Sequence, residues 1–272
     1  MNLSTHTAVS FQGEQGAFSE MAVLKLFGSD VVPEPTVSFQ HVFEKVSTGV
    51  CEYGVVPIEN SLGGVVYQVW DCLYDFDLSI VAETQLEIEQ CLIVTPGTSM
   101  EEIKKVYSHY QPALQCSKFL QEHNEWTIVD AYDTAGSVKI IKELQNKGDK
   151  YLAAIASERA ADVYGMTILE KGIQDSKQNI TRFVVITKKG LETGNKFTAV
   201  LSLENKVGTL KEVLQLAHDY RVNLTSIHSR PNKSTPFSYI FFIEGVHEKN
   251  TPLFLIEMKR KVSDCKILGV YA

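Results

Sequence analysis

Short apolar segments alternate with stretches of helical periodicity through the first two thirds of the chain, and this alternation limits the possible folds. The apolar segments, typical of buried strands, are residues 8–11, 54–58, 92–94, 126–129 and 153–156. Helical spacing is present at residues 17–24, 65–73, 134–146 and 157–164. Strands that alternate with helices predict an α/β domain with a mainly parallel sheet. In such a domain, ligands bind where strands end and helices begin.

The pattern changes near residue 190. Residues 188–196 are polar and contain two glycines, which is typical of a linker. Apolar spacing beyond them predicts the order βαββαβ, from segments at 197–203, 210–217, 222–229, 237–243, 253–261 and 267–271. That order gives an antiparallel sheet with both helices on one face. We therefore expect two domains, residues 1–190 and 196–272.

Charge and cysteine usage exclude several classes of function. The chain has 26 basic and 33 acidic residues, a net charge of −7. Nucleic acids and membrane surfaces attract basic proteins, so we expect neither as a partner. Met1–Thr7 lacks the pattern of a signal peptide, and no apolar run is long enough to span a bilayer. Five scattered cysteines without a C-x-x-C pair indicate reduced thiols in the cytoplasm. Asn179 and Asn223 each fit the acceptor pattern for N-glycosylation, but in the cytoplasm they would not be glycosylated.

Two glycine-containing stretches that follow predicted strands are candidate binding sites. In "QGEQGAFSE" (12–20), Gly13 and Gly16 lead into a helix whose free N–H groups form an anion site; the alternative is a tight turn alone. In "VVPIENSLGGVV" (55–66), Glu59, Asn60 and Ser61 stand at the end of a strand and can hold a polyoxygenated substrate. Their alternative role is to cap the following helix.

Three further stretches place polar residues at the ends of predicted elements. Asp133-Thr134 is a good helix start, and Ser157-Glu158 follows an apolar strand, where a half-buried glutamate would be a candidate proton donor. The alternative for the second is a capping serine with a solvated glutamate. Thr181 and Arg182 stand beside Asn179 at the entrance of a strand, and the alternative there is a polar strand end with a surface arginine.

These five stretches favour proton donation and orientation over nucleophilic catalysis. No histidine or cysteine stands beside any of them, so nucleophilic triads and thiol chemistry are unsupported. The seven histidines are dispersed, and none has metal-ligand spacing, so we predict no metal site and no cofactor. The stretches offer carboxylates, hydroxyls, amides and helix N-termini, which suit a small anionic substrate.

In this order, the stretches resemble the signatures of the prephenate dehydratase family over nearly the whole chain. The hallmark of that family is Thr-Arg-Phe, present here at 181–183. The matching motifs are "GEQGAFSE", "GVVPIENSLGG", "DTAG", "AAIASERAADVYG" and "NITRFVVI". The second domain is similar to the ACT regulatory domain of this family, with "NKVGTL" (205–210) and "HSRP" (228–231) in place of its phenylalanine-binding motifs.

The resemblance implies a fold, a reaction and a set of roles. It implies two α/β lobes like those of periplasmic binding proteins, with a substrate cleft, followed by the ACT domain. The reaction is the conversion of prephenate to phenylpyruvate, water and carbon dioxide. Thr181 would be the catalytic hydroxyl, with Glu59 or Glu158 as proton source. The substrate-binding residues would be Asn60, Ser61, Thr134, Gly13, Gly16 and Arg182, although Arg182 has a structural alternative because successive strand residues point to opposite faces.

The resemblance also implies L-phenylalanine as an effector. Its binding residues would be Asn205, Gly208, Thr209, Leu210, His228, Ser229 and Arg230. Thr209 replaces the usual alanine of the family, and His228 replaces its usual glutamate. The second change exchanges an acceptor for a neutral or cationic group, which could weaken phenylalanine binding or make it depend on pH. The alternative for His228 is a packed strand residue.

Two other functions are compatible with these motifs. One is arogenate dehydratase, which carries out the same chemistry on the aminated substrate. The other is a non-catalytic amino-acid sensor, which the intact set of cleft residues disfavours. Because ACT domains commonly pair, we expect a homodimer or homotetramer.

Overall fold

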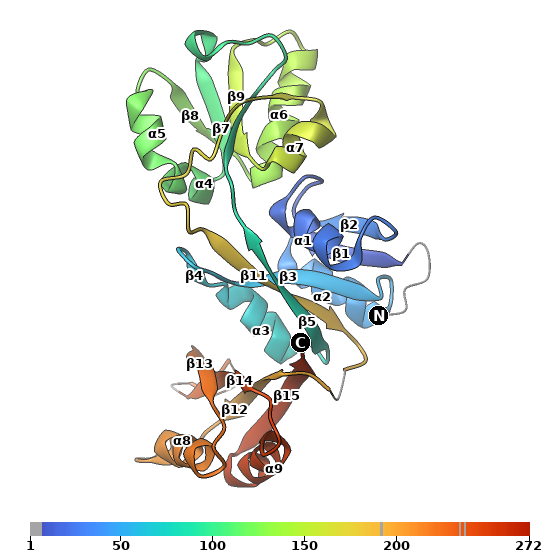
Figure 1. Ribbon diagram of the computed structural model, residues 1–272, viewed down its shortest axis with the longest axis vertical. Coiled ribbons are helices and arrows are strands. Elements are labelled where there is room, and N and C mark those ends of the chain that lie inside the picture. The colour runs from blue at the N-terminus through green and yellow to red at the C-terminus, as the bar shows by residue number, and fades with distance from the viewer. Residues whose placement is uncertain (1–6, 191–192, 234, 237) are drawn as a thin grey trace.

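The computed structural model describes residues 7–190, 193–233, 235–236 and 238–272, and its elements form three tiers built on three β-sheets (Figure 1). We call these tiers the first lobe, the second lobe and the C-terminal unit. Three expectations concern segments that lie partly outside the described residues. They are the lack of a signal peptide in Met1–Thr7, the linker at 188–196 and the strand at 237–243, whose positions 1–6, 191–192 and 237 are not described.

The first lobe is a six-stranded sheet with helices on both faces. Its strand order is β2-β1-β3-β11-β5, and β4 pairs with β3. The strands are β1 (Ala8–Gln12), β2 (Val32–Thr36), β3 (Tyr53–Asn60), β4 (Gly64–Val65), β5 (Ser79–Glu87) and β11 (Ile180–Thr187). Helix α1 (Phe18–Phe27) packs on one face, and the other face is covered by α2 (Phe39–Thr48) and α3 (Tyr67–Asp75).

The second lobe is a five-stranded sheet in the order β10-β6-β9-β7-β8. Its strands are β6 (Cys91–Val94), β7 (Lys105–Ser108), β8 (Thr127–Asp130), β9 (Leu152–Ala156) and β10 (Thr167–Lys171). Its helices are α4 (Tyr110–Gln115), α5 (Ser117–Glu122), α6 (Thr134–Asn146) and α7 (Glu158–Tyr164), with a short 3₁₀ turn at Met100–Glu102. Apolar residues of α1, α6 and α7 share one core, which joins the two lobes.

Both lobes have mixed sheets, so the expectation of mainly parallel sheet is wrong. Parallel pairing is limited to β2-β1-β3 and β9-β7-β8. The chain crosses to the second lobe between β5 and β6 and returns between β10 and β11. The returning strand β11 therefore runs antiparallel to both β3 and β5, between which it lies. This return brings residues near 181 beside residues near 60.

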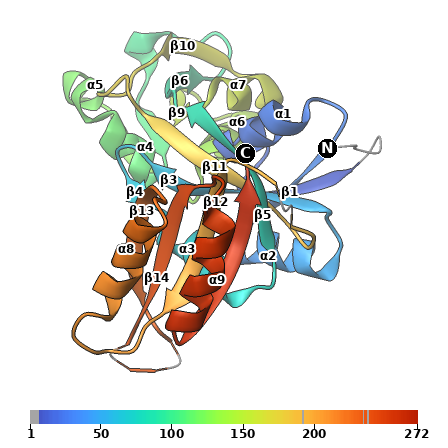
Figure 2. The same ribbon diagram turned by 60° about the horizontal axis from the view of Figure 1, so that its bottom comes forward.

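The C-terminal unit confirms the predicted order βαββαβ. It consists of β12 (Lys196–Ser202), α8 (Thr209–Asp219), β13 (Leu224–Pro231), β14 (Tyr239–Val246), α9 (Thr251–Lys261) and β15 (Asp264–Tyr271). The four strands are antiparallel, in the order β13-β14-β12-β15. Figure 2 shows both helices on the same face of this sheet. The division into domains at 1–190 and 196–272 stays a prediction.

The free face of this sheet packs on the first lobe through a common hydrophobic core. Phe242, Leu268 and Tyr271 are fully buried there against Trp70 and Ile80 of the first lobe. Polar contacts cross the same interface: the Lys266 ammonium donates to the carbonyls of Leu73, Tyr74 and Phe76 at the end of α3. A cation at the C-terminal end of a helix satisfies carbonyls that have no partner within the helix.

Two further expectations concern the cysteines and the membrane. All five cysteines are free thiols, of which Cys51, Cys91 and Cys116 are buried. Within the described part of the chain, no helix combines the length and the apolar character that a bilayer span needs.

The close packing of Gly269 against the first lobe leads to a stability prediction. A Cβ on Gly269 of β15 would lie 2.2 Å from the Ile80 carbonyl oxygen of β5. Gly269→Ala must therefore separate the two strands, and overpacking of this kind costs about 1–3 kcal/mol. We expect urea denaturation to show that loss in the free energy of unfolding. An unchanged unfolding curve would contradict the close packing of β15 on β5.

Candidate active site

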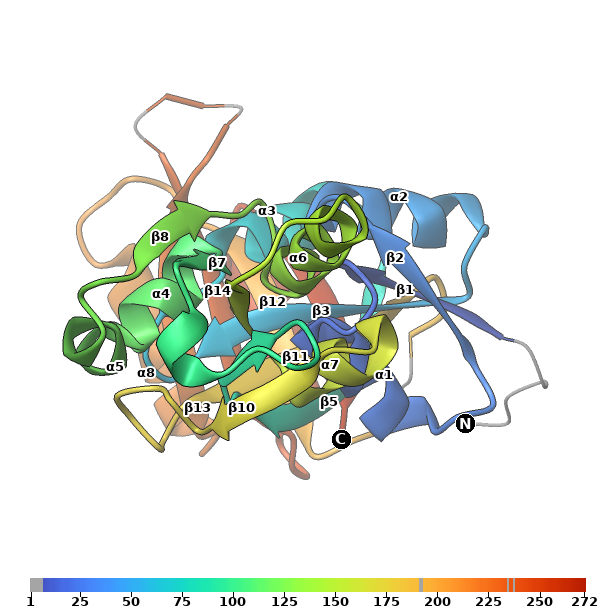
Figure 3. The same ribbon diagram turned by 90° about the horizontal axis from the view of Figure 1, so that it is seen from above.

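A cavity of about 700 Å³ lies between the two lobes, and both contribute to its lining. The first lobe contributes the ends of β1 and β3 with the starts of α1 and α2, and the second contributes the starts of α4 and α6. In Figure 3, seen from above, the second lobe lies in front of β3 and β11. The cavity thus has the position expected for an α/β ligand site.

Thr181 and Asn60 face each other across neighbouring strands in the cavity lining. The Asn60 Nδ2 donates to Thr181 Oγ1 at 2.9 Å and to Asn179 Oδ1 at 2.7 Å. The orientation of this amide is determined, because its Oδ1 accepts from the backbone N–H groups of Leu62 and Gly63 at 3.0 and 2.7 Å. Thr181 Oγ1 is therefore an acceptor toward Asn60, which leaves its own hydrogen for a ligand.

A chain of amides continues from Asn60 across both segments that connect the lobes. Asn179, on the returning segment, donates to Gln115 Oε1 at 3.0 Å, and Gln90, on the outgoing segment, donates to the same oxygen at 3.3 Å. Asn179 and Gln90 are each only 1% exposed. Gln90 and Gln115 were not among the predicted site residues. Their partners are distant in sequence, and Gln115 ends a short helix, so no local pattern could have found them.

Helices α1 and α6 are two of the helices that begin at the cavity. Helix α1 has no side-chain cap, and Phe18 and Ser19 at its start line the cavity. Helix α6 begins at Thr134, which also lines the cavity, and Asp133 caps it by accepting from the Gly136 N–H at 2.8 Å. Among the described lining residues, none is a lysine or arginine. An anionic ligand would therefore depend on helix N-termini and amide donors.

Gly13 and Gly16 do not offer free N–H groups to such an anion. The Gly13 N–H donates to the Thr36 carbonyl at 2.9 Å, and the Gly16 N–H donates to the buried carboxylate of Glu20. Gly16 instead permits close packing of the lobes, because a Cβ there would lie 2.6 Å from Ala160 Cα. The helix N–H groups without a partner in the helix begin two residues further on, at Phe18, and anion binding at this turn stays a prediction.

Ser61 joins the end of β3 to the returning segment rather than lining the cavity. Its Oγ donates to the Gln178 carbonyl and accepts from the Ile180 N–H, each at 2.9 Å. These bonds hold the chain just before Thr181 in place. The substrate-binding role of Ser61 stays a prediction.

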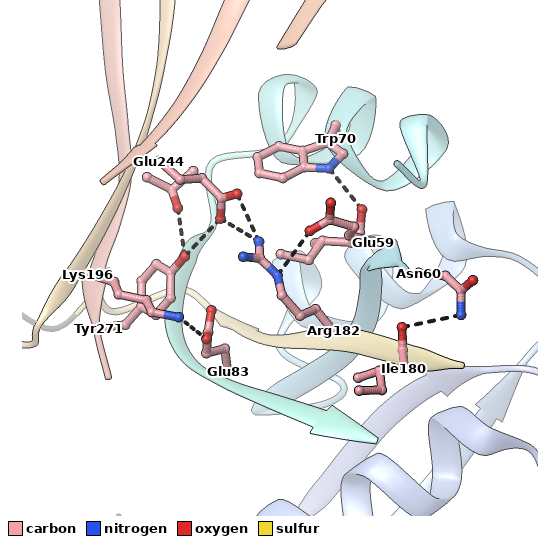
Figure 4. A network of polar contacts seen from close by, with 11 residues as sticks. Glu59, Asn60, Trp70, Glu83, Ile180, Arg182, Lys196, Glu244 and Tyr271 are labelled. Carbon is pink, nitrogen blue, oxygen red and sulfur yellow. Dashed lines mark hydrogen bonds and ion pairs between the residues drawn. The ribbon is translucent and has the colours of Figure 1, made fainter. Parts of the chain in front are cut away.

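Glu59, Arg182 and Glu158 are not among the residues that line the cavity. Figure 4 shows Glu59 and Arg182 together on the face of the sheet opposite to Asn60. Arg182 Nη2 donates to both carboxylate oxygens of Glu244 at 2.8 Å, and its Nε lies 3.5 Å from Glu59 Oε2. Glu158 is at the solvent-exposed start of α7, 2.6 Å from Lys171 Nζ. The geometry thus supports the structural alternative for Arg182 and lends no support to either glutamate as proton source.

The family of the chain follows from comparison with known proteins. The family described as prephenate dehydratase matches residues 9–191. The chain belongs to the prephenate dehydratase family. It is 34% identical over 268 residues to a bifunctional chorismate mutase/prephenate dehydratase from Stutzerimonas stutzeri, covering 97% of this chain and 72% of that protein. Prephenate dehydratases are lyases, which places the chain in that class of enzymes.

Two solved structures extend this comparison. The prephenate dehydratase from Arthrobacter aurescens in complex with L-Phe is 29% identical, with a TM-score of 0.88, covering 97% of this chain and 89% of that chain. A protein described as GqqA, a novel type of quorum quenching acylase, is 27% identical with a TM-score of 0.86 and covers 97% of both chains.

The first predicted effector motif of the chain surrounds the start of α8. Gly208 begins the helix with a φ of 95°, and the Thr209 hydroxyl donates to the Glu204 carbonyl at 3.0 Å. A cavity of about 400 Å³ beside them is lined by Thr209, Lys206 and Val207 among others. Asn205 is exposed and Leu210 is half-buried. Effector binding by these residues stays a prediction.

The second predicted effector motif faces α3 of the first lobe. The His228 ring lies 4.4 Å from the Trp70 ring and 5.2 Å from the Phe242 ring between centroids, and neither of its nitrogens has a hydrogen-bond partner. Arg230 forms two hydrogen bonds with the Asp71 carboxylate, at 2.9 and 2.8 Å. Ser229 points the other way and is exposed. In this structure, His228 is a packed strand residue, the alternative considered for it.

The packing of His228 predicts an acid-dependent loss of stability. Burial, with the nearby guanidinium groups of Arg230 and Arg182, lowers the pKa of His228 from 6.5 to about 4. Between pH 6.5 and pH 4, His228 binds a proton in the unfolded chain but not in the folded chain. The free energy of unfolding therefore falls as the pH drops below 6.5, and His228 makes no pH-dependent contribution above that value. The full loss is on the order of 3 kcal/mol.

Denaturation curves between pH 7 and pH 4.5 test this prediction. We expect His228→Phe to lose less stability over that range than the parent protein. His218→Phe, at an exposed histidine, is the matched control and should follow the parent. Equal slopes for the parent and His228→Phe would contradict the linkage.

Proposed function

We propose that the cavity between the lobes is the site of decarboxylating dehydration of prephenate to phenylpyruvate, with Thr181 assisting the departure of the ring hydroxyl. One observation carries this proposal: the Asn60 amide donates to Thr181 Oγ1, so the Thr181 hydrogen is left for the cavity. A hydroxyl held in this way donates a hydrogen bond to a leaving oxygen.

The chemistry asks little of the protein beyond holding the substrate and assisting the leaving group. Prephenate has two carboxylates and a hydroxyl on a nonaromatic ring. As the C–O bond breaks, the leaving hydroxyl takes a proton from the solvent and departs as water; the bond between the ring and its carboxylate breaks, carbon dioxide leaves, and the electron pair of that bond enters the ring. The product ring is aromatic, which supplies the driving force. Thr181 hardly ionises, so it stabilises the leaving oxygen by a hydrogen bond rather than as a full proton donor.

The substrate carboxylates need donors, and the lining supplies neutral ones. The backbone N–H groups of Phe18 and Ser19 at the start of α1 suit one carboxylate. Gln115 uses its oxygen for Asn179 and Gln90, so its NH₂ group is a further donor beside the cavity.

Variants of Thr181 and Asn60 test the direction of the hydroxyl. Thr181→Ala should lower kcat on prephenate by ~10²–10³-fold, the usual effect of removing one preorganised hydrogen-bond donor to an oxygen that gains negative charge, and Thr181→Ser should retain most of the activity. Asn60→Asp has nearly the same shape but accepts where Asn60 donates, so it would turn the Thr181 hydrogen away from the cavity. We expect it to approach Thr181→Ala in phenylpyruvate formation. Full activity of Asn60→Asp would contradict the proposal.

A second candidate is acyl hydrolysis, because the similarity to the quorum quenching acylase extends over 97% of both chains. An acyl-transferring threonine needs a base that takes its proton. The described partner of Thr181 Oγ1 is instead the NH₂ group of Asn60, which donates. An assay with an N-acyl amide substrate, beside prephenate and arogenate, distinguishes the three activities.

We also propose L-phenylalanine as the effector, a homodimer or homotetramer as the assembly, and a cytoplasmic location. The prephenate dehydratase from Arthrobacter aurescens in complex with L-Phe supports the first of these. Light scattering with and without L-phenylalanine tests the second.

Titration calorimetry tests effector binding near the start of α8. We expect L-phenylalanine to bind and to lower the rate on prephenate. Thr209→Arg should fill the neighbouring cavity and weaken binding by about tenfold or more, equivalent to ~1.4 kcal/mol. Thr225→Arg, at an exposed position of β13, is the control for an added arginine. Equal affinity in both variants would move the effector site elsewhere.

A further inference from the structure

We propose that Glu244 of the C-terminal unit is a positioning residue for Thr181, acting through Arg182. The proposal rests on the role proposed above for Thr181. It assigns a part in the active site to a residue that lies outside the two lobes and outside the cavity lining.

Thr181 and Arg182 are neighbours on β11, and their side chains point to opposite faces of the sheet. Thr181 faces the cavity with Asn60, while Arg182 faces the C-terminal unit with Glu59. In Figure 4, the Arg182 side chain extends from β11 toward Glu244. Any displacement of the Arg182 backbone therefore displaces Thr181 as well.

The contact between Arg182 and Glu244 is buried and geometrically specific. Glu244, on β14, is 5% exposed, and both of its oxygens accept from Arg182 Nη2 at 2.8 Å. Its Oε1 also lies 3.5 Å from the Tyr271 hydroxyl, which is 2.7 Å from Thr198 Oγ1. A buried pair of charges resists separation, because removal of one partner leaves the other charge without compensation. The arginine is thus firmly attached to the C-terminal sheet.

The ladder between β11 and β3 is irregular at this point, whereas the ladder between β11 and β5 is regular from Ile180 to Val185. Arg182 pairs with Glu59 of β3, but the next residue, Phe183, pairs with Pro57, which leaves Ile58 unmatched. The Ile58 carbonyl accepts from the Val66 N–H at 3.0 Å and from the Trp70 indole N–H at 3.1 Å. Such a bulge redirects side chains and weakens local pairing. The side chain of Arg182 then helps to determine where this part of β11 lies.

The chain offers a matched control for this pair. Arg230 and Asp71 form a second two-pronged pair across the same interface, at 2.9 and 2.8 Å, but Asp71 is on α3 and not on β11. Both pairs fasten the C-terminal unit to the first lobe. Only the Arg182–Glu244 pair acts on the strand that contains Thr181.

The test compares Glu244→Ala with Asp71→Ala by steady-state kinetics on prephenate. A misplacement of a catalytic group by a fraction of an ångström lowers kcat, so we expect about a tenfold or greater loss in Glu244→Ala with KM changed less than about twofold. Asp71→Ala should keep both constants within about twofold. Glu244→Gln, which keeps the shape and loses the charge, replaces Glu244→Ala if the latter does not fold.

Hydrogen exchange gives a readout that does not depend on activity. We expect peptides that contain residues 180–183 to exchange faster in Glu244→Ala than in the parent, and to be unchanged in Asp71→Ala. Unchanged exchange and kcat in both Glu244 variants, or an equal loss in Asp71→Ala, would overturn the proposal. A parent protein without activity on prephenate would refute the proposed function, and exchange at residues 180–183 would still decide whether Glu244 positions β11.

Discussion

Strand β11 is paired on both sides, with β3 and with β5, and every part of the site depends on this pairing. It brings Thr181 beside Asn60, although the two residues are 121 positions apart in sequence. The segment before it meets Gln115 of the second lobe through Asn179, and its Arg182 reaches the C-terminal unit. One strand thus connects the two walls of the cavity and the C-terminal unit.

The turn after Asn60 determines the direction of the hydrogen bonds at this strand pair, on which the proposed chemistry depends. The two backbone N–H groups that bind Asn60 Oδ1 force its NH₂ group toward Thr181 and Asn179. A hydroxyl that accepts from an amide retains its own proton for a ligand. Helix starts without side-chain cations complete the site, so anion binding and leaving-group assistance both depend on neutral dipoles in preorganised positions.

Local patterns predicted the elements well where periodicity was strong. Helix α6 has the bounds predicted from its spacing, and the C-terminal order βαββαβ is as expected. Strand β5 was missed, because "SIVAETQLE" mixes polar and apolar residues, and its antiparallel pairing with β11 depends on a return of the chain that no local window contains. The expectation of a mainly parallel sheet was wrong for the same reason.

Site residues were predictable from the sequence where they lie at the end of a strand or at the start of a helix. Thr181, Asn60 and Thr134 line the cavity because each stands at a strand end or helix start. Glu59 and Arg182 were grouped with them from sequence proximity, but the alternation of strand side chains turns both toward the C-terminal unit. Gln90 and Gln115 had no local signal, since their contacts with each other and with Asn179 exist only in the folded chain.

A double-mutant cycle of Asn60→Asp and Thr181→Val, measured as the single-turnover rate on prephenate, tests the central claim most directly. If Asn60 acts by directing the Thr181 proton, the double variant should react no more slowly than Thr181→Val alone, because the proton that Asn60 directs is already absent. If the two losses multiply, Asn60 and Thr181 act independently, and the direction of the Thr181 hydroxyl is not what the site depends on.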